Sequence, residues 1–137
     1  MSTKIFVNLP VKDLNKSKEF FTKIGYTFNP QFSDDTAACV VISEDIFVMI
    51  LTHAKYKEFT KKEIADSTKT SEVLNCLSFD SKQKVNNFVD AAIKAGATEP
   101  REPMDYGFMF ARSFDDLDGH TWEAMYMDMN AAPPKPE

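Results

Sequence analysis

The nine residues Asp115–Glu123, DDLDGHTWE, concentrate groups that could do chemistry: three aspartates, a histidine, a tryptophan and a glutamate. Carboxylates at this density could hold a calcium-like cation, and Glu123 could act as a general acid or base. Aspartates beside a glycine are also turn formers, because they make Asx-type hydrogen bonds and Gly119 can take a positive φ. We favour the turn over the calcium-like cluster. We also expect Trp122 to pack in the core against a helix, with a ligand-stacking role as the alternative.

Composition limits the function classes. The chain has 137 residues, 43% of them hydrophobic, and its net charge of -5 comes from interspersed acidic and basic residues. Without a basic patch we expect no nucleic-acid partner. Without an apolar run near the ~20 residues of a membrane span, or a signal-peptide pattern, we expect no membrane partner and a cytoplasmic location. Cys39 and Cys76 are expected to be reduced and buried, with a disulfide or a nucleophile as alternatives.

The elements that must position these groups follow from hydrophobic patterning. Strands are predicted at 4–11, 26–32 (broken by Pro30), 36–43, 46–52, 72–79, 107–114 and 120–127. One helix follows the cap Asp13 and ends at Gly25. Another follows Asp80 or Ser81 and ends at Gly96. The polar, Lys-rich stretch 53–71 is predicted to be a linker, with one helical turn around 57–65.

The two halves repeat the same order of elements. A first βαβββ module spans 1–52 and a second spans 72–129, within one structural domain, and the tail 130–137 is expected to be loose. Each module has an apolar sheet face that a second module could cover. The predicted fold class is therefore α+β, with two βαβββ modules whose curved sheets surround a cavity and whose helices lie outside.

The paired βαβββ pattern, the opening LPVKDLNKSKEFF and the closing DDLDGHTWE resemble the vicinal oxygen chelate superfamily over roughly residues 4–128. That superfamily includes glyoxalase I, extradiol dioxygenases, and fosfomycin and bleomycin resistance proteins. The segment EPREPMDYGFMFARSFDDLDGHTWE looks closer still to an uncharacterised bacterial glyoxalase-like subgroup. The resemblance implies a small-molecule ligand and a homodimer.

In metal-dependent members, four His or Glu side chains hold a divalent metal such as nickel, zinc, manganese or iron. The matching positions here are Phe6, Ile50 (or Met49, one register off), Leu74 and Glu123. Three of these four positions are apolar, and because of this departure from the family pattern we expect no metal there and no cofactor, with a divalent metal as the less favoured alternative. The same departure weakens the case for glyoxalase I or dioxygenase chemistry.

The resemblance implies that Phe6, Ile50, Leu74 and Glu123 face the cavity, and strand parity then predicts which side chains lie beside them. The predicted substrate-binding residues are Phe6, Asn8, Val48, Ile50, Leu74, Cys76, Tyr106, Phe108, Arg112 and Met125. Arg112 could hold a ligand carboxylate, and a solvated arginine is the alternative. Glu123, the candidate catalytic residue, could be a retained ligand without a metal, a general base or acid, or a structural or substrate-binding group. In the last case it would bond to Asn8, Tyr106 or the backbone.

Three functions remain open from the sequence. The first is a metal-independent binder of a small, partly apolar molecule, similar to the resistance proteins. The second is a lyase or isomerase, lactoylglutathione-lyase-like or dioxygenase-related, with Glu123 as base or metal ligand. The third is a structural or protein-interaction role.

Overall fold

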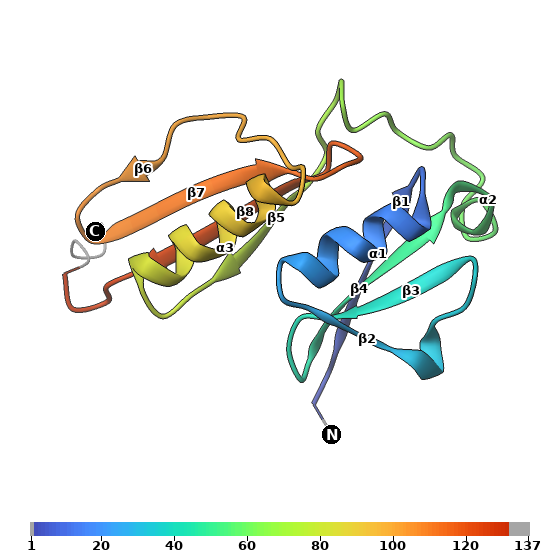
Figure 1. Ribbon diagram of the computed structural model, residues 1–137, viewed down its shortest axis with the longest axis horizontal. Coiled ribbons are helices and arrows are strands. Elements are labelled where there is room, and N and C mark those ends of the chain that lie inside the picture. The colour runs from blue at the N-terminus through green and yellow to red at the C-terminus, as the bar shows by residue number, and fades with distance from the viewer. Residues whose placement is uncertain (1, 132–137) are drawn as a thin grey trace, which may run out of the picture. The chain divides into compact units, whose positions relative to one another are not determined.

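The computed structural model describes residues 2–131 (Figure 1). The chain divides into two compact units, Met1–Thr70 and Ser71–Glu137. The first contains β1 (Ile5–Val11), α1 (Leu14–Lys23), β2 (Thr27–Asn29), the 3-10 turn η1 (Pro30–Phe32), β3 (Ala37–Val41), β4 (Ile46–Thr52) and α2 (His53–Tyr56). The second contains β5 (Leu74–Ser78), α3 (Lys82–Lys94), β6 (Met104–Asp105), β7 (Met109–Asp115) and β8 (Thr121–Met127).

The two units have the same topology. The first sheet has the order β1-β4-β3-β2, and the second has the order β5-β8-β7-β6. In each, the strand before the helix pairs in parallel with the last strand of the unit, and the other pairings are antiparallel. This confirms the α+β class and the repeated βαβββ order. Each sheet is open at both edges, and a cavity between curved sheets stays a prediction.

One helix covers one face of each sheet. The helix α1 packs on β3 and β4, and α3 packs on β7 and β8, as Figure 1 shows. Buried aromatic rings fill these interfaces: Phe20 and Phe21 meet edge to face at 5.2 Å, and Phe88 lies 5.6 Å from Phe114. Burial of such large apolar side chains is the main favourable term in folding.

The helix boundaries follow the predicted capping chemistry. The carboxylate of Asp13 accepts from Lys16 N at 3.1 Å, which confirms it as the N-cap of α1. Of the two candidates for α3, the cap is Ser81, whose hydroxyl accepts from Lys84 N at 3.1 Å. Gly25 and Gly96 follow the helix ends with φ of 107° and 117°, a conformation that glycine tolerates best.

Two predicted elements have other bounds in the structure, and one strand was not predicted. The helical turn expected near 57–65 lies instead at His53–Tyr56, because the Thr52 side chain caps a helix directly at the end of β4. The strand expected over 26–32 is confined to Thr27–Asn29, and the predicted break at Pro30 is confirmed, since the Asn29 side chain caps the turn that Pro30 begins. The two-residue strand β6 was not predicted, since it is too short for an alternating pattern. Of the predicted tail 130–137, residues 132–137 lie outside the part of the chain that the structure describes.

Candidate functional site

Three rows of side chains cross the face of the second sheet that lies opposite α3. Paired residues in a sheet point to the same side, so the register defines the rows. Across the strands they read Leu74–Thr121–Asp115, Cys76–Glu123–Ser113 and Ser78–Met125–Ala111–Met104. The register agrees with the predicted placement of Leu74, Cys76 and Met125 on the face of Glu123. Ligand binding by these residues stays a prediction.

Arg101 is the partner of Glu123. Its Nη2 lies 2.6 Å from Glu123 Oε2, and the two side chains are 34% and 21% exposed. A half-buried carboxylate requires such compensation. The partners considered from the sequence were Asn8, Tyr106 and the backbone, and none of them is the one found.

Arg101 escaped notice because it lies between prolines, outside every predicted strand and helix. One signal in the sequence could have pointed to it. The chain has two arginines, Arg101 and Arg112, among 16 Lys and Arg residues. Arginine is preferred over lysine where a planar group must hold a carboxylate. Both arginines do this in the structure.

Cys76 lies beside this ion pair and is exposed, which corrects the expectation of a buried thiol, whereas Cys39 is buried as predicted. Both cysteines are free. Loss of hydration raises the pKa of the Cys76 thiol, the negative charge of Glu123 raises it further, and the cation of Arg101 opposes both. The thiol therefore responds to the charge of both members of the pair.

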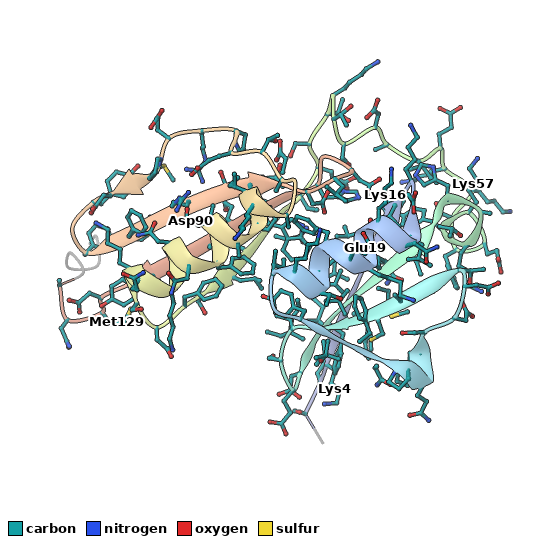
Figure 2. All side chains as sticks on the ribbon, viewed as in Figure 1. Lys4, Lys16, Glu19, Lys57, Asp90 and Met129 are labelled. Atoms are coloured by element: carbon teal, nitrogen blue, oxygen red, sulfur yellow. The ribbon has the colours of Figure 1, made fainter. Side chains whose placement is uncertain are left out.

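Arg112 does not belong to this face. It points to the side of α3, where it bonds to Glu99, Asp90 and Asn86 at 2.9 Å. Figure 2 labels Asp90 on α3. The hydrogen bonds that Arg112 donates to the Glu99 carboxylate are the main cause of its raised pKa. The side chain is 11% exposed, which contradicts the solvated alternative. These contacts form a structural clamp, and binding of a ligand carboxylate by Arg112 stays a prediction.

Tyr106 and Phe108 lie next to the row that contains Met104 and Met125. Their rings stack at 6.4 Å, and the Tyr106 hydroxyl lies 3.5 Å from Met104 Sδ. Tyr106 is 59% exposed. The pair therefore borders the rows described above, and its role in ligand binding stays a prediction.

The first sheet also has a face opposite its helix, and it carries Phe6 and Asn8. Phe6 stacks on Phe47 at 4.7 Å and meets Phe32 edge to face at 6.5 Å. The Asn8 amide donates to the carbonyl of Phe6 at 3.0 Å. Met49 pairs with Asn8 and shares this face.

Val48 and Ile50 were expected on the same sheet face as Phe6, and this expectation is wrong. The register pairs Val48 with Val7 and Ile50 with Leu9, one residue out of step with Phe6. Both side chains are buried on the side of α1. A shift of one residue reverses the face of every side chain in a strand, so Met49 is the residue that occupies the position predicted for Ile50.

The residues at the four metal-ligand positions do not fit a metal. Phe6 and Leu74 offer no donor atom, Met49 offers only a weakly binding thioether, and Glu123 is held by Arg101. Within residues 2–131, no group of three or more His, Cys, Asp or Glu side chains is arranged to hold a metal ion.

Asp116 organises the turn 115–119. Its Oδ1 accepts from the backbone N–H groups of Asp118 and His120, and its Oδ2 accepts from Trp122 Nε1, each at 3.0 Å. Burial raises the pKa of Asp116, against the opposing charge of His120. Trp122 is buried and stacks on Phe114 at 6.4 Å. The turn and the core role of Trp122 are both confirmed.

Comparison with known proteins agrees with this architecture. Residues 3–43 match the family model described as bleomycin resistance protein-like N-terminal. A search of the curated proteins gives no match to the chain. No helix within residues 2–131 is both long and apolar enough to cross a membrane.

Several solved structures share the fold. A hypothetical protein from S. aureus is 25% identical, with 92% of this chain and 95% of that chain covered and a TM-score of 0.76. A glyoxalase/bleomycin resistance protein/dioxygenase family enzyme from Burkholderia phytofirmans is 16% identical, with 92% and 99% covered and a TM-score of 0.75. The fosfomycin resistance protein FosX from Listeria monocytogenes is 19% identical, with 100% and 96% covered and a TM-score of 0.65.

The fold is thus that of the glyoxalase/bleomycin resistance/dioxygenase proteins. The fold and the N-terminal family match confirm the resemblance to the vicinal oxygen chelate superfamily that the sequence indicated.

Proposed function

We propose that this protein binds a small, partly apolar molecule, without a metal, on the face of the second sheet that carries Glu123. The observation that supports this proposal most directly is the ion pair between Arg101 and Glu123. A guanidinium occupies the carboxylate that would otherwise be free to bind a metal. Methionines next to the pair supply an adaptable apolar surface.

The composition of this face suits a binding site. Small-molecule sites are mostly apolar, with a few polar groups that fix the orientation of the ligand. Here the row Met104, Ala111 and Met125 lies beside the row Cys76, Glu123 and Ser113. Two of the fold relatives, from Listeria monocytogenes and Mesorhizobium loti, are fosfomycin resistance proteins.

Metal content of protein purified without chelator tests the metal-independent part of the proposal. We expect no stoichiometric metal, and no saturable binding of nickel, zinc or manganese by the wild type or by Glu123→Gln. Stoichiometric metal that is lost in Glu123→Gln would contradict the proposal. Assays with hemithioacetal and catechol substrates would then follow, since lyase and dioxygenase chemistry would become the better explanation.

A thermal-shift screen of small molecules tests the binding part. We expect ligands that raise the melting temperature of the wild type and of the exposed control Glu102→Ala, but not of Glu123→Ala. A screen in which every hit acts equally on all three proteins would place binding elsewhere. Pairing of two copies, which the resemblance implies, is a separate proposal that sedimentation equilibrium would test.

A further inference from the structure

Two hydrogen-bond donors on the Glu123 face have no acceptor. Arg101 Nη1 and Ser113 Oγ are both shielded from solvent, and neither bonds to any group within the described residues. Ser113 is 1% exposed, and its residue pairs directly with Glu123 across the strands. Arg101 uses its other terminal nitrogen, Nη2, to hold Glu123. Both unused donors therefore flank one carboxylate.

Buried polar groups are normally hydrogen-bonded, so each of these donors calls for an acceptor. Serine can donate one hydrogen bond, and a guanidinium nitrogen that holds no other acceptor has its N–H groups free. A carbonyl oxygen has two lone pairs and can accept from two donors at once. One such oxygen within hydrogen-bonding distance of both Arg101 and Ser113 would satisfy both donors.

The charge balance favours a neutral acceptor. The cation of Arg101 is already matched by Glu123 at 2.6 Å. An added carboxylate would bring a second negative charge next to Glu123 at a half-buried position, where like charges repel strongly. Burial is the main cause of the raised pKa of the Cys76 thiol, and of its two charged neighbours Glu123 raises this pKa more than Arg101 lowers it. A ketone, ester or amide avoids this repulsion.

The apolar part of such a ligand has an adjacent surface. Met125 and Ala111 lie two residues along their strands from Glu123 and Ser113, on the same face. Two residues along a strand correspond to roughly 7 Å, about the length of a six-membered ring with its substituent. Met104 extends this apolar row to β6.

We propose that this face binds a neutral carbonyl compound, whose oxygen accepts from Arg101 and Ser113 and whose apolar body lies on Met125, Ala111 and Met104. This inference rests on the proposed binding function and adds the class of ligand. Glu123 is then a positioning residue, which orients the guanidinium toward the ligand oxygen.

Three probes of nearly equal shape test the inference: acetophenone, benzoate and ethylbenzene. Saturation-transfer NMR titrations would measure their dissociation constants with the wild type, Ser113→Ala, Arg101→Met and the exposed serine control Ser43→Ala. We expect acetophenone to bind at least tenfold more tightly than the other two. We expect Ser113→Ala and Arg101→Met to weaken acetophenone three- to tenfold and to leave ethylbenzene unchanged, with Ser43→Ala like the wild type.

The outcomes separate the two proposals. Benzoate binding more tightly than acetophenone, or equal binding of all three probes, would overturn the carbonyl assignment while small-molecule binding stands. Absence of binding by all three overturns it as well, and if the thermal-shift screen also finds no ligand, the proposed function falls with it. Unfolding curves show whether Arg101→Met folds, and Ser113→Ala, a smaller change, keeps the test valid if it does not.

Discussion

Arg112 holds Glu99 through two parallel hydrogen bonds, from Nε to Oε2 and from Nη2 to Oε1, each 2.9 Å long. Thr98, one residue earlier, forms a backbone bridge with Asp115 at 2.8 and 3.1 Å. Arg101 follows two residues after Glu99. These contacts on the α3 side of the sheet therefore anchor the segment 98–101. The same segment places Arg101 on the opposite face, beside Glu123.

Arg112→Met should lower the free energy of unfolding by about 1–3 kcal/mol, because it leaves the carboxylate of Glu99 half-buried without its partner. Urea unfolding would measure the loss. Lys84→Met is the control, since it removes an exposed ion pair with Asp80 and should change stability by less than about 0.5 kcal/mol. Equal effects of the two substitutions would show that the clamp contributes nothing beyond surface charge.

The reactivity of Cys76 should change in opposite directions in two variants. Glu123→Gln removes a negative charge that raises the thiol pKa, so it should speed alkylation at pH 8. Arg101→Met removes the cation that lowers this pKa, so it should slow alkylation.

Iodoacetamide labelling followed by mass spectrometry gives the rate at Cys76 as a function of pH. Buried Cys39 is an internal reference, since its own pKa is raised by burial and neither substitution lies in its unit. A change of the same sign in both variants would indicate a general loosening of the structure rather than an effect of charge.

Asp116→Asn should destabilise the protein by an amount that depends on pH. Burial raises the folded pKa of Asp116 above its ordinary 3.8. The stability that this group contributes is therefore fully present below pH 3.8 and is lost as the pH rises through the folded pKa. The excess stability of the wild type over Asp116→Asn should shrink across this window.

A fixed difference of about 1–3 kcal/mol should remain at higher pH, because the asparagine amide would face the indole donor of Trp122. Urea unfolding of both proteins at several pH values gives the comparison. The exposed Asp34 is the control of opposite sign: Thr36 lowers its pKa, so its contribution is lost as the pH falls. If the difference in unfolding free energy between the wild type and Asp116→Asn is constant or grows with pH, the prediction for Asp116 is contradicted.

Gly96→Ala and Gly25→Ala should lower stability by similar amounts, about 1–3 kcal/mol, because both glycines have positive φ that alanine rarely adopts. A Cβ at Gly96 would lie 3.2 Å from Leu117 Cδ2, whereas a Cβ at Gly25 meets nothing within 4 Å. Leu117 is 42% exposed and free to turn away. Thermal unfolding should therefore separate the two variants by less than about 0.5 kcal/mol, and a larger gap would mean that Leu117 is fixed.

The repeated βαβββ order was predictable because it depends on local signals: alternating strands, caps such as Asp13, and glycines after the helices. The placement of Met125 on the face of Glu123 followed from parity within one strand, whereas that of Cys76 also needed Leu74 as the matching family position on its own strand. Neighbouring strands are harder, because parity fixes faces only within one strand. Hydrogen-bond register decides whether Ile50 or Met49 lies on the face of Phe6, and a sequence pattern does not specify it.

The pairing of Arg101 with Glu123 could not be predicted for a different reason, although the rarity of arginine in the chain marks the residue itself. It lies in an irregular segment whose path depends on Arg112, Glu99 and the bridge at Thr98, all of them tertiary contacts. The residues of that clamp come from α3, β7 and the segment between α3 and β6, so no periodicity in the sequence links them. Part of the candidate site could therefore be predicted. Alternation indicates which side chains share a sheet face, but it does not indicate that Arg101 pairs with Glu123.

The position of β8 has a consequence for synthesis of the chain on the ribosome. β8 lies between β5 and β7 in its sheet, yet it is the last strand to be made. Until residues 121–127 have left the exit tunnel, β5 has no partner strand and β7 has only the two-residue β6. A nascent chain, or one that ends at a premature stop codon near residue 120, would hold a first unit able to form its own sheet and a second unit without the strand that joins it. Degradation of such truncated products should accordingly begin in the second unit.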